Sequence, residues 1–191
     1  MIDLIKELRE KTGAGVMDCR RALIESKGDF NKAVQIIKER GIEIALKKSE
    51  RQVKEGRVEA YVHLGDKLGV IVEINCETDF VARNELFKKM CRDVAMQIAA
   101  ANPSYIKAED IPQDVLKEEK KNFELGFSGD KKELSKQWEE YLSKFLKEKC
   151  LLEQPFIKDE KITVREYINS MIAQFGENIQ VRRFTRYQLG E

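Results

Sequence analysis

The spacing of the apolar residues changes twice along this chain, and this change limits the possible folds more than any other feature of the sequence. Over residues 1–40, apolar side chains recur every three or four positions, which is typical of amphipathic helices. Over residues 58–76 they alternate with polar residues, which is typical of strands with one buried face. From residue 86 the helical spacing returns. The pattern predicts an α+β protein that begins with helices.

The first forty residues predict three short helices. The first ends at a Gly-Ala-Gly sequence, the second stops at Gly28, and the third is capped by Asp29 and ends before Gly41. A three-helix unit of this size has only a thin core. We therefore expect residues 1–43 to form a docking module, followed by a polar, mildly basic linker at 44–57.

The strand-like region predicts an antiparallel hairpin that turns at residues 65–67. The alternation places one set of side chains on the buried face, namely Val58, Ala60, Val62 and Leu64. The intervening residues, Glu59, Tyr61 and His63, are then expected to face solvent. An amphipathic helix follows from Leu86 to Ile98 and is closed by Asn102 and Pro103.

The remainder, residues 58–191 as a whole, is expected to form one α+β core. Residues 112–150 predict a charged helical hairpin that breaks between 126 and 130. Thr163 and Glu166 form a capping box for a last helix. Residues 179–189 predict a closing strand with an unpaired edge, whose alternation slips near Arg183 as it would at a β-bulge.

Charged residues make up 36% of the chain, but the two signs balance. Lys and Arg number 35 and Asp and Glu number 34, for a formal net charge of +1. A dedicated nucleic-acid binder usually has a basic excess or a basic patch. No apolar run reaches the roughly 18–20 residues that span a bilayer. We therefore expect neither a nucleic acid nor a membrane as a partner.

The four cysteines show no metal-binding or disulfide pattern. Cys19, Cys76, Cys91 and Cys150 form no C-x-x-C pair and have no histidine nearby. A zinc site and a disulfide framework are both unexpected for such spacing. Because the N-terminus also lacks a cleavable signal pattern, the sequence predicts a cytoplasmic protein with reduced, mostly buried thiols.

Residues with catalytic chemistry are scarce. His63, the only histidine, falls on the polar side of a predicted strand. Residues 13–16 resemble a phosphate-binding loop only superficially, because no strand precedes them and no Gly-Lys-Ser/Thr follows; a turn between helices is the preferred interpretation. Cys76 and Cys91 have no evident base to activate a thiolate. The sequence predicts a binding protein that is not an enzyme and has no cofactor, metal or bound nucleotide.

Residues 75–84, which join a strand to a helix, are the most distinctive segment. They read NCETDFVARN, and Asn84 can cap the following helix. Phe80 lies outside the regular apolar stripe of that helix. Two interpretations remain open: Phe80 fills the core at this corner, or it projects beside Asp79 as a wedge. Burial of one Phe in a partner contributes roughly 1.5–3 kcal/mol.

Three blocks of sequence resemble the elongation factor Ts family, the nucleotide-exchange factors of the translational GTPase elongation factor Tu. They are LREKTGAGVMDCRRA at 8–22, VEINCETDFVARN at 72–84, and LLEQPFIKDE at 151–160 with FGENIQVRRF at 175–184. The blocks occur in the family order and extend over nearly the whole chain. The resemblance implies a three-helix domain like the ubiquitin-associated (UBA) domain, followed by an α+β core.

The resemblance also implies which residues contact the partner. The TDFVA motif, here Thr78, Asp79, Phe80 and Val81, inserts beside the nucleotide site of elongation factor Tu. By this analogy Phe80 enters an apolar pocket between two helices, and Asp79 disturbs the polar network and water around Mg²⁺. The N-terminal module docks on another helix through Arg9, Val16 and Met17. Phe175 and Gly176 match a further, weaker contact.

Length distinguishes the chain from longer members of the family, which carry a second core subdomain and a coiled coil. The chain resembles the short form, in which two copies pair through their sheets, so the resemblance implies a homodimer and a 2:2 complex with elongation factor Tu. The alternative function is that of a UBA-type adaptor, in which the three-helix unit binds a peptide or a ubiquitin-like surface. Binding of RNA is a third and more distant possibility.

Overall fold

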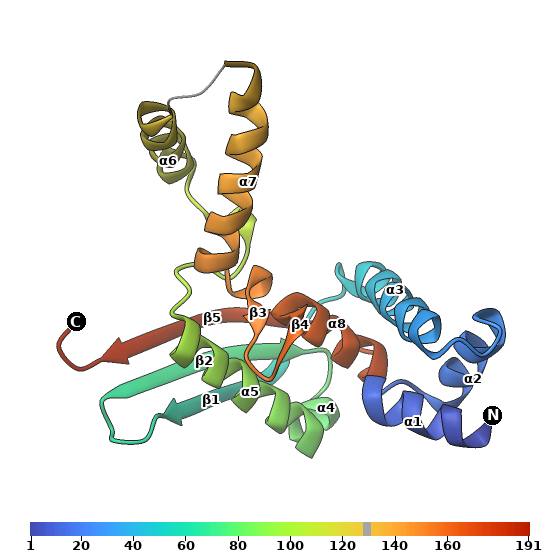
Figure 1. The fold of residues 1–191 in the computed structure, drawn as a ribbon. Coiled ribbons are helices and arrows are strands. Elements are labelled where there is room, and N and C mark those ends of the chain that lie inside the picture. Colours follow the sequence, from blue (N-terminus) through green and yellow to red (C-terminus); the bar gives the residue numbers. More distant parts are fainter. Residues whose placement is uncertain (128–130) are drawn as a thin grey trace.

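The computed structural model of the chain describes residues 1–127 and 131–191 and shows an α+β protein (Figure 1). Its N-terminal part is the predicted set of three helices, α1 (Ile2–Thr12), α2 (Val16–Glu25) and α3 (Phe30–Lys48). They enclose a small core built from Leu8, Cys19, Ala22, Leu23 and Ala33. The Asp29 side chain caps α3 as predicted, because its Oδ1 accepts a hydrogen bond from the Lys32 amide at 3.0 Å.

The third helix does not end at Gly41. It continues to Lys48, and Gly41 is buried where α3 packs against α8 (Val164–Phe175). A Cβ atom at Gly41 would lie 3.9 Å from the carbonyl oxygen of Asn169. This is an ordinary van der Waals distance, so it is the packing of α3 against α8 that stabilises the helix through Gly41 and offsets the cost of about 1 kcal/mol of glycine in a helix. The helix therefore runs across the boundary expected after residue 43.

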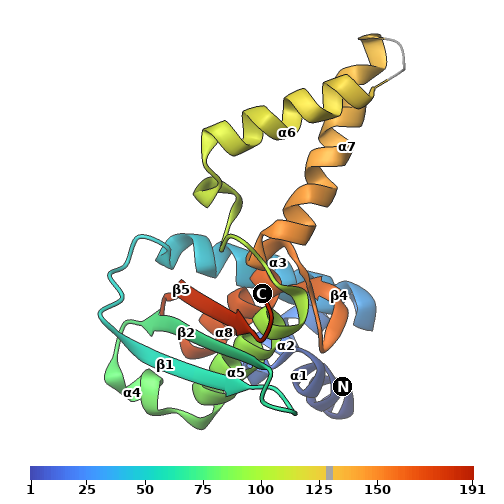
Figure 2. The same cartoon turned by 90° about the vertical axis from the view of Figure 1, so that its left-hand side faces the viewer.

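The sheet is antiparallel and three-stranded, with the order β1-β2-β5. Its strands are β1 (Glu55–Val62), β2 (Leu68–Cys76) and β5 (Ile179–Gln188), and α5 (Glu85–Ala101) packs against one face (Figures 1 and 2). β5 is an edge strand, as the sequence predicts. Its register against β2 shifts between Glu73 and Ile74, opposite Arg183, which confirms the predicted bulge.

The predicted orientation of β1 was wrong. Glu59 pairs with Val72 and Tyr61 with Val70, so these two side chains point toward α5 with the buried face of β2. Val58 and Val62 are instead 63% and 59% exposed. The buried carboxylate of Glu59 accepts from Nε of Arg57 at 2.8 Å and from a terminal nitrogen of Arg92 at 3.4 Å. These two guanidinium groups compensate the charge and make its burial possible.

The main core lies between the sheet, α5 and α8. Asn84 caps α5 through a 2.8 Å bond from the Leu86 amide to its Oδ1, and Asn102 ends the helix with a φ of +43°. The capping box of Thr163 and Glu166 at the start of α8 is also present. These helix ends were predicted correctly because they depend on residues close in sequence.

The charged segment after α5 forms a hairpin of α6 (Gln113–Gly126) and α7 (Lys131–Lys149) that projects away from the sheet (Figures 1 and 2). Tyr141 on α7 donates to a carboxylate oxygen of Glu119 on α6 at 2.8 Å. The predicted break at 126–130 lies partly outside the described residues. Across residues 1–127 and 131–191, the helices are too short or too polar to span a lipid bilayer.

Short elements connect the hairpin to the core. They are the 3₁₀ turns η1 (Ala108–Asp110) and η2 (Leu151–Glu153) and the strands β3 (Pro155–Phe156) and β4 (Asp159–Thr163). The two strands pair with each other in a separate two-stranded sheet. They were not predicted, because β3 is only two residues long and shows no periodicity.

Candidate partner-binding surface

The segment 75–84 folds into a short helix, α4 (Asp79–Arg83), between β2 and α5. Thr78 caps it: its Oγ1 accepts from the Val81 amide at 3.4 Å. Asn84 ends α4 and also caps α5, so each end of the corner is fixed by a local hydrogen bond. The corner is therefore an ordered structure and presents its side chains in defined directions.

Two neighbouring apolar residues of α4 have opposite environments. Phe80 is 81% exposed, whereas Val81 is 6% exposed and belongs to the main core. The interpretation that Phe80 fills the core is thus wrong, because Val81 occupies that place. Asp79 is also exposed, and its Oδ2 lies 3.0 Å from a guanidinium nitrogen of Arg83. Arg83 was missed as part of this surface, although an acid and a base four positions apart are a recognisable helical pair.

The turn between α8 and β5 contacts this corner from the other end of the sequence. Both carboxylate oxygens of Glu177 accept hydrogen bonds from residues 77 and 78. Of the two predicted residues nearby, Gly176 is exposed with a φ of +71°, whereas Phe175 is half-buried. The Phe175 ring packs edge-on against Phe87 at 6.2 Å, so it is in large part a core residue.

The N-terminal module exposes the three residues that the sequence singled out. Arg9 lies near the end of α1, and Val16 and Met17 form the first turn of α2, with Met17 58% exposed. The module and α4 lie at the same end of the molecule, opposite the α6–α7 hairpin (Figure 1). Both sets of exposed residues therefore lie away from the hairpin.

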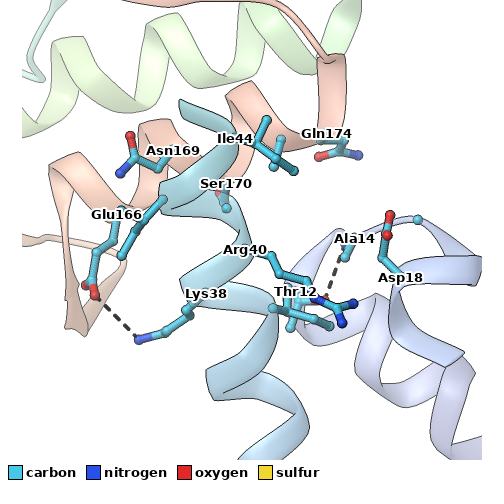
Figure 3. A pocket seen from close by; sticks show the side chains of 15 residues that line it. Thr12, Ala14, Asp18, Lys38, Arg40, Ile44, Glu166, Asn169, Ser170 and Gln174 are labelled. Atoms are coloured by element: carbon cyan, nitrogen blue, oxygen red, sulfur yellow. Dashed lines mark hydrogen bonds and ion pairs between the residues drawn. The ribbon is translucent and has the colours of Figure 1, made fainter. Parts of the chain in front are cut away.

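A small cavity lies where the N-terminal module meets α8 (Figure 3). Its walls come from the α1–α2 turn, from α3 and from α8, and Nζ of Lys38 lies 3.9 Å from the Glu166 carboxylate across it. Its volume of about 100 Å³ is below the 300–1,000 Å³ of typical ligand sites. Gly13 next to it has a φ of +69° and donates to the Arg9 carbonyl, so residues 13–16 are a turn between helices, as preferred from the sequence.

The two cysteines and the histidine considered for chemistry have ordinary structural environments. Burial raises the pKa of Cys76 to about 11 and that of Cys91 to about 12, so both remain thiols at neutral pH. His63 is exposed, and its Nδ1 lies 2.9 Å from the Tyr61 hydroxyl. In the described part of the chain, no group of three or more His, Cys, Asp or Glu side chains is placed to hold a metal ion.

Comparison with known proteins gives one consistent result. The family model described as "Elongation factor TS" matches residues 3–191. The elongation factor Ts of Methylacidiphilum infernorum is 55% identical over 191 residues, which cover 100% of this chain and 95% of that protein. The elongation factor Ts of Thermodesulfovibrio yellowstonii is 52% identical over 190 residues, or 98% of this chain and 95% of that protein. The elongation factor Ts of Rippkaea orientalis is 54% identical, and the match covers 77% of its length.

Proposed function

The chain belongs to the elongation factor Ts family of translation elongation factors, and from this membership we propose that it is a guanine-nucleotide exchange factor for elongation factor Tu. It binds the GDP-bound partner in the cytoplasm and promotes release of GDP. It has no nucleotide site of its own and makes or breaks no covalent bond. Its activity consists of a preference for one state of the partner.

The observation that carries this proposal is the exposure of Phe80 on an ordered corner. An aromatic side chain that is 81% exposed has nearly its whole apolar surface available for burial in a partner. Val81 anchors the same helix in the core, so α4 keeps its position when Phe80 contacts the partner. Asp79 supplies a negative charge beside the ring, which acts on the water and polar groups around the partner's Mg²⁺.

The energetics follow from linkage. A factor that binds nucleotide-free elongation factor Tu more tightly than the GDP-bound form must weaken GDP binding by the same ratio. Each tenfold loss of GDP affinity requires about 1.4 kcal/mol of differential contact. Burial of one Phe contributes roughly 1.5–3 kcal/mol. Burial of Phe80 alone thus accounts for a loss of GDP affinity of about 10- to 100-fold. The disturbed Mg²⁺ site weakens GDP binding further.

The test is the rate of GDP release from elongation factor Tu, measured by stopped flow with a fluorescent GDP. Phe80→Ala should reduce the acceleration by at least about tenfold, since it removes the contact that distinguishes the two partner states. Leu125→Ala on the hairpin is a matched control, because Leu125 is a similarly exposed apolar residue, at 77%. Unchanged acceleration by Phe80→Ala would refute the wedge.

We further propose that two copies pair through the open face of the sheet. The register places Ala60, Ile71 and Thr185 in one row of this face, and Val62, Gly69 and Tyr187 in the next. The members of these rows with large apolar side chains, Ile71, Val62 and Tyr187, are all exposed. An uncharged, apolar strip on the open face of a sheet is suited to a second, identical sheet.

The pairing is tested by sedimentation. The unmodified chain should sediment as a dimer at micromolar concentration, and Ile71→Asp should shift it to a monomer because it buries two unpaired charges per dimer. A control on the opposite face of the sheet would disturb the core. The matched control is therefore Leu125→Asp, at an exposed position on the hairpin. A monomeric unmodified chain would contradict this proposal and leave the exchange proposal intact.

A further inference from the structure

In the turn between α8 and β5, the carboxylate of Glu177 binds the segment that precedes α4. Oε2 of Glu177 accepts from the backbone amides of Glu77 at 3.1 Å and Thr78 at 3.0 Å. Its Oε1 accepts from the Thr78 hydroxyl at 2.6 Å. Both oxygens are therefore used, and all their partners lie in the two residues directly before Asp79. Hydrogen bonds to an ionised acceptor are about twice as strong as those between neutral groups.

This contact sets the direction of α4. The Thr78 hydroxyl has one hydrogen, which it donates to Glu177, so its lone pairs remain free for the amide of Val81. That second bond is the N-cap of α4. Because a helix starts where its cap is placed, Glu177 determines where the first turn of α4 begins. Asp79 and Phe80 both lie in that turn.

The same turn also holds the end of the N-terminal module. The buried side-chain amide of Asn178 donates to the backbone carbonyls of Ser49 at 3.2 Å and Arg51 at 2.8 Å, in the segment that follows α3. The ammonium of Lys48, the last residue of α3, donates to the Gly176 carbonyl. Gly176 ends α8 in the αL conformation. Residues 176–178 then contact both the end of α3 and the segment before α4.

A third set of contacts closes the connection. Oε1 of Glu77 accepts from the backbone amide of Asn178 at 2.6 Å, and its Oε2 lies 3.5 Å from a guanidinium nitrogen of Arg51. Glu77 and Glu177 thus make reciprocal bonds, each carboxylate accepting from the other segment's backbone. Three segments far apart in sequence, residues 48–51, 77–78 and 176–178, form one network.

We propose that Glu177 is a positioning residue for nucleotide exchange. It fixes the wedge relative to the N-terminal module, so that docking of the module on the partner brings Phe80 to its pocket. The inference rests on the proposed function. Its energetic basis is preorganisation: a corner held in its bound geometry loses little conformational freedom on insertion, whereas a free corner spends part of the contact energy on becoming ordered.

The test compares Glu177→Ala and Glu177→Gln in GDP release from elongation factor Tu. Glu177→Ala should lower the maximal rate about 10- to 100-fold, the range expected when a reacting group is misplaced by about 1 Å. The concentration giving half-maximal rate should change little, since the docking residues are intact. Glu177→Gln should restore most of the rate, because its amide oxygen still accepts from both backbone amides. Glu160→Ala, at an exposed glutamate on β4, is the matched control.

A double-mutant cycle with Phe80→Ala separates positioning from general destabilisation. If Glu177 acts through the wedge, Glu177→Ala should have almost no further effect on the maximal rate in the Phe80→Ala background. Additive effects would overturn the inference, as would an unchanged rate for Glu177→Ala alone. If Glu177→Ala does not fold, Thr78→Ala takes its place, since it removes the hydroxyl bond and the cap; an unchanged rate in that variant would equally overturn the inference.

The two proposals fail in different ways. If the unmodified chain does not accelerate GDP release, the proposed function itself is wrong. If the unmodified chain accelerates release and Phe80→Ala abolishes the effect, but Glu177→Ala behaves like Glu160→Ala, only the positioning role is wrong.

Discussion

Phe80 and Val81 are adjacent in the first turn of α4 and have opposite environments, the first 81% and the second 6% exposed. One residue faces outward and its neighbour anchors the helix in the core. The corner therefore combines a contact surface and an anchor within one peptide unit. The two side chains should accordingly respond to substitution in opposite ways.

Val81→Ala should lower the free energy of unfolding by about 1–3 kcal/mol, because it leaves a cavity in the core. Phe80→Ala should change it by less than about 0.5 kcal/mol, since the ring contributes little to the folded chain. Urea unfolding of the two variants measures both values. An equally large loss in Phe80→Ala would mean that the ring packs on its own chain.

Met17→Ala should act on docking rather than on exchange itself. Loss of about 1 kcal/mol of contact corresponds to a roughly fivefold higher concentration for half-maximal exchange, with an unchanged maximal rate. Ile24→Ala, two turns further along α2, is a control of similar exposure, 56% against 58%. A titration of the exchange rate against factor concentration distinguishes them. A lower maximal rate in Met17→Ala would contradict the separation of docking from wedging.

Asp93→Ala should lower the free energy of unfolding by about 1–3 kcal/mol. The buried carboxylate of Asp93 accepts from Nζ of Lys158 at 2.6 Å and from the Tyr167 hydroxyl at 3.0 Å, and so joins α5 to β3–β4 and α8. Lys158 can turn to solvent in the variant, but the Tyr167 hydroxyl is left without its acceptor. Tyr167→Phe in the Asp93→Ala background should therefore recover part of the loss. No recovery would place the cost elsewhere.

The buried thiols predict how stability depends on alkaline pH. Burial raises the pKa of Cys76 to about 11 and of Cys91 to about 12, from an ordinary 9.0. The unfolded chain therefore loses these protons first, and the contribution of the thiols is complete below pH 9 and declines as the pH rises through 11 and 12. Unfolding measured between pH 8 and pH 10.5 should show this decline. Cys91→Ala should flatten it, and an identical slope would contradict the assignment.

The helices and their ends could be predicted from the sequence because their determinants are local. Asp29, Asn84 and the Thr163–Glu166 pair each act within three residues of the end that they cap. The α+β class and the bulge of β5 followed from the periodicity of the apolar residues. The exposure of Phe80 could not be predicted, because the spacing of apolar residues does not distinguish a buried core residue from an exposed contact residue.

The errors arose where distant residues decide. Glu59 is buried because Arg92, which is 33 positions away, covers it together with Arg57; an alternation rule counts it as polar and therefore outward. Gly41 continues a helix because α8 lies against it. Glu177 was overlooked because its partners are about one hundred residues earlier in the chain, and nothing near residue 177 indicates them.

The continuity of α3 across residue 43 has a consequence for how the chain can be divided. Its first half supports the three-helix unit and its second half covers α8. A cut anywhere between residues 40 and 48 exposes the apolar surface of α8 in the core fragment. It also shortens α3 in the N-terminal fragment. Truncated fragments should therefore fold less stably than the same regions do in the whole chain. Point substitutions are better suited to assigning a role to each contact.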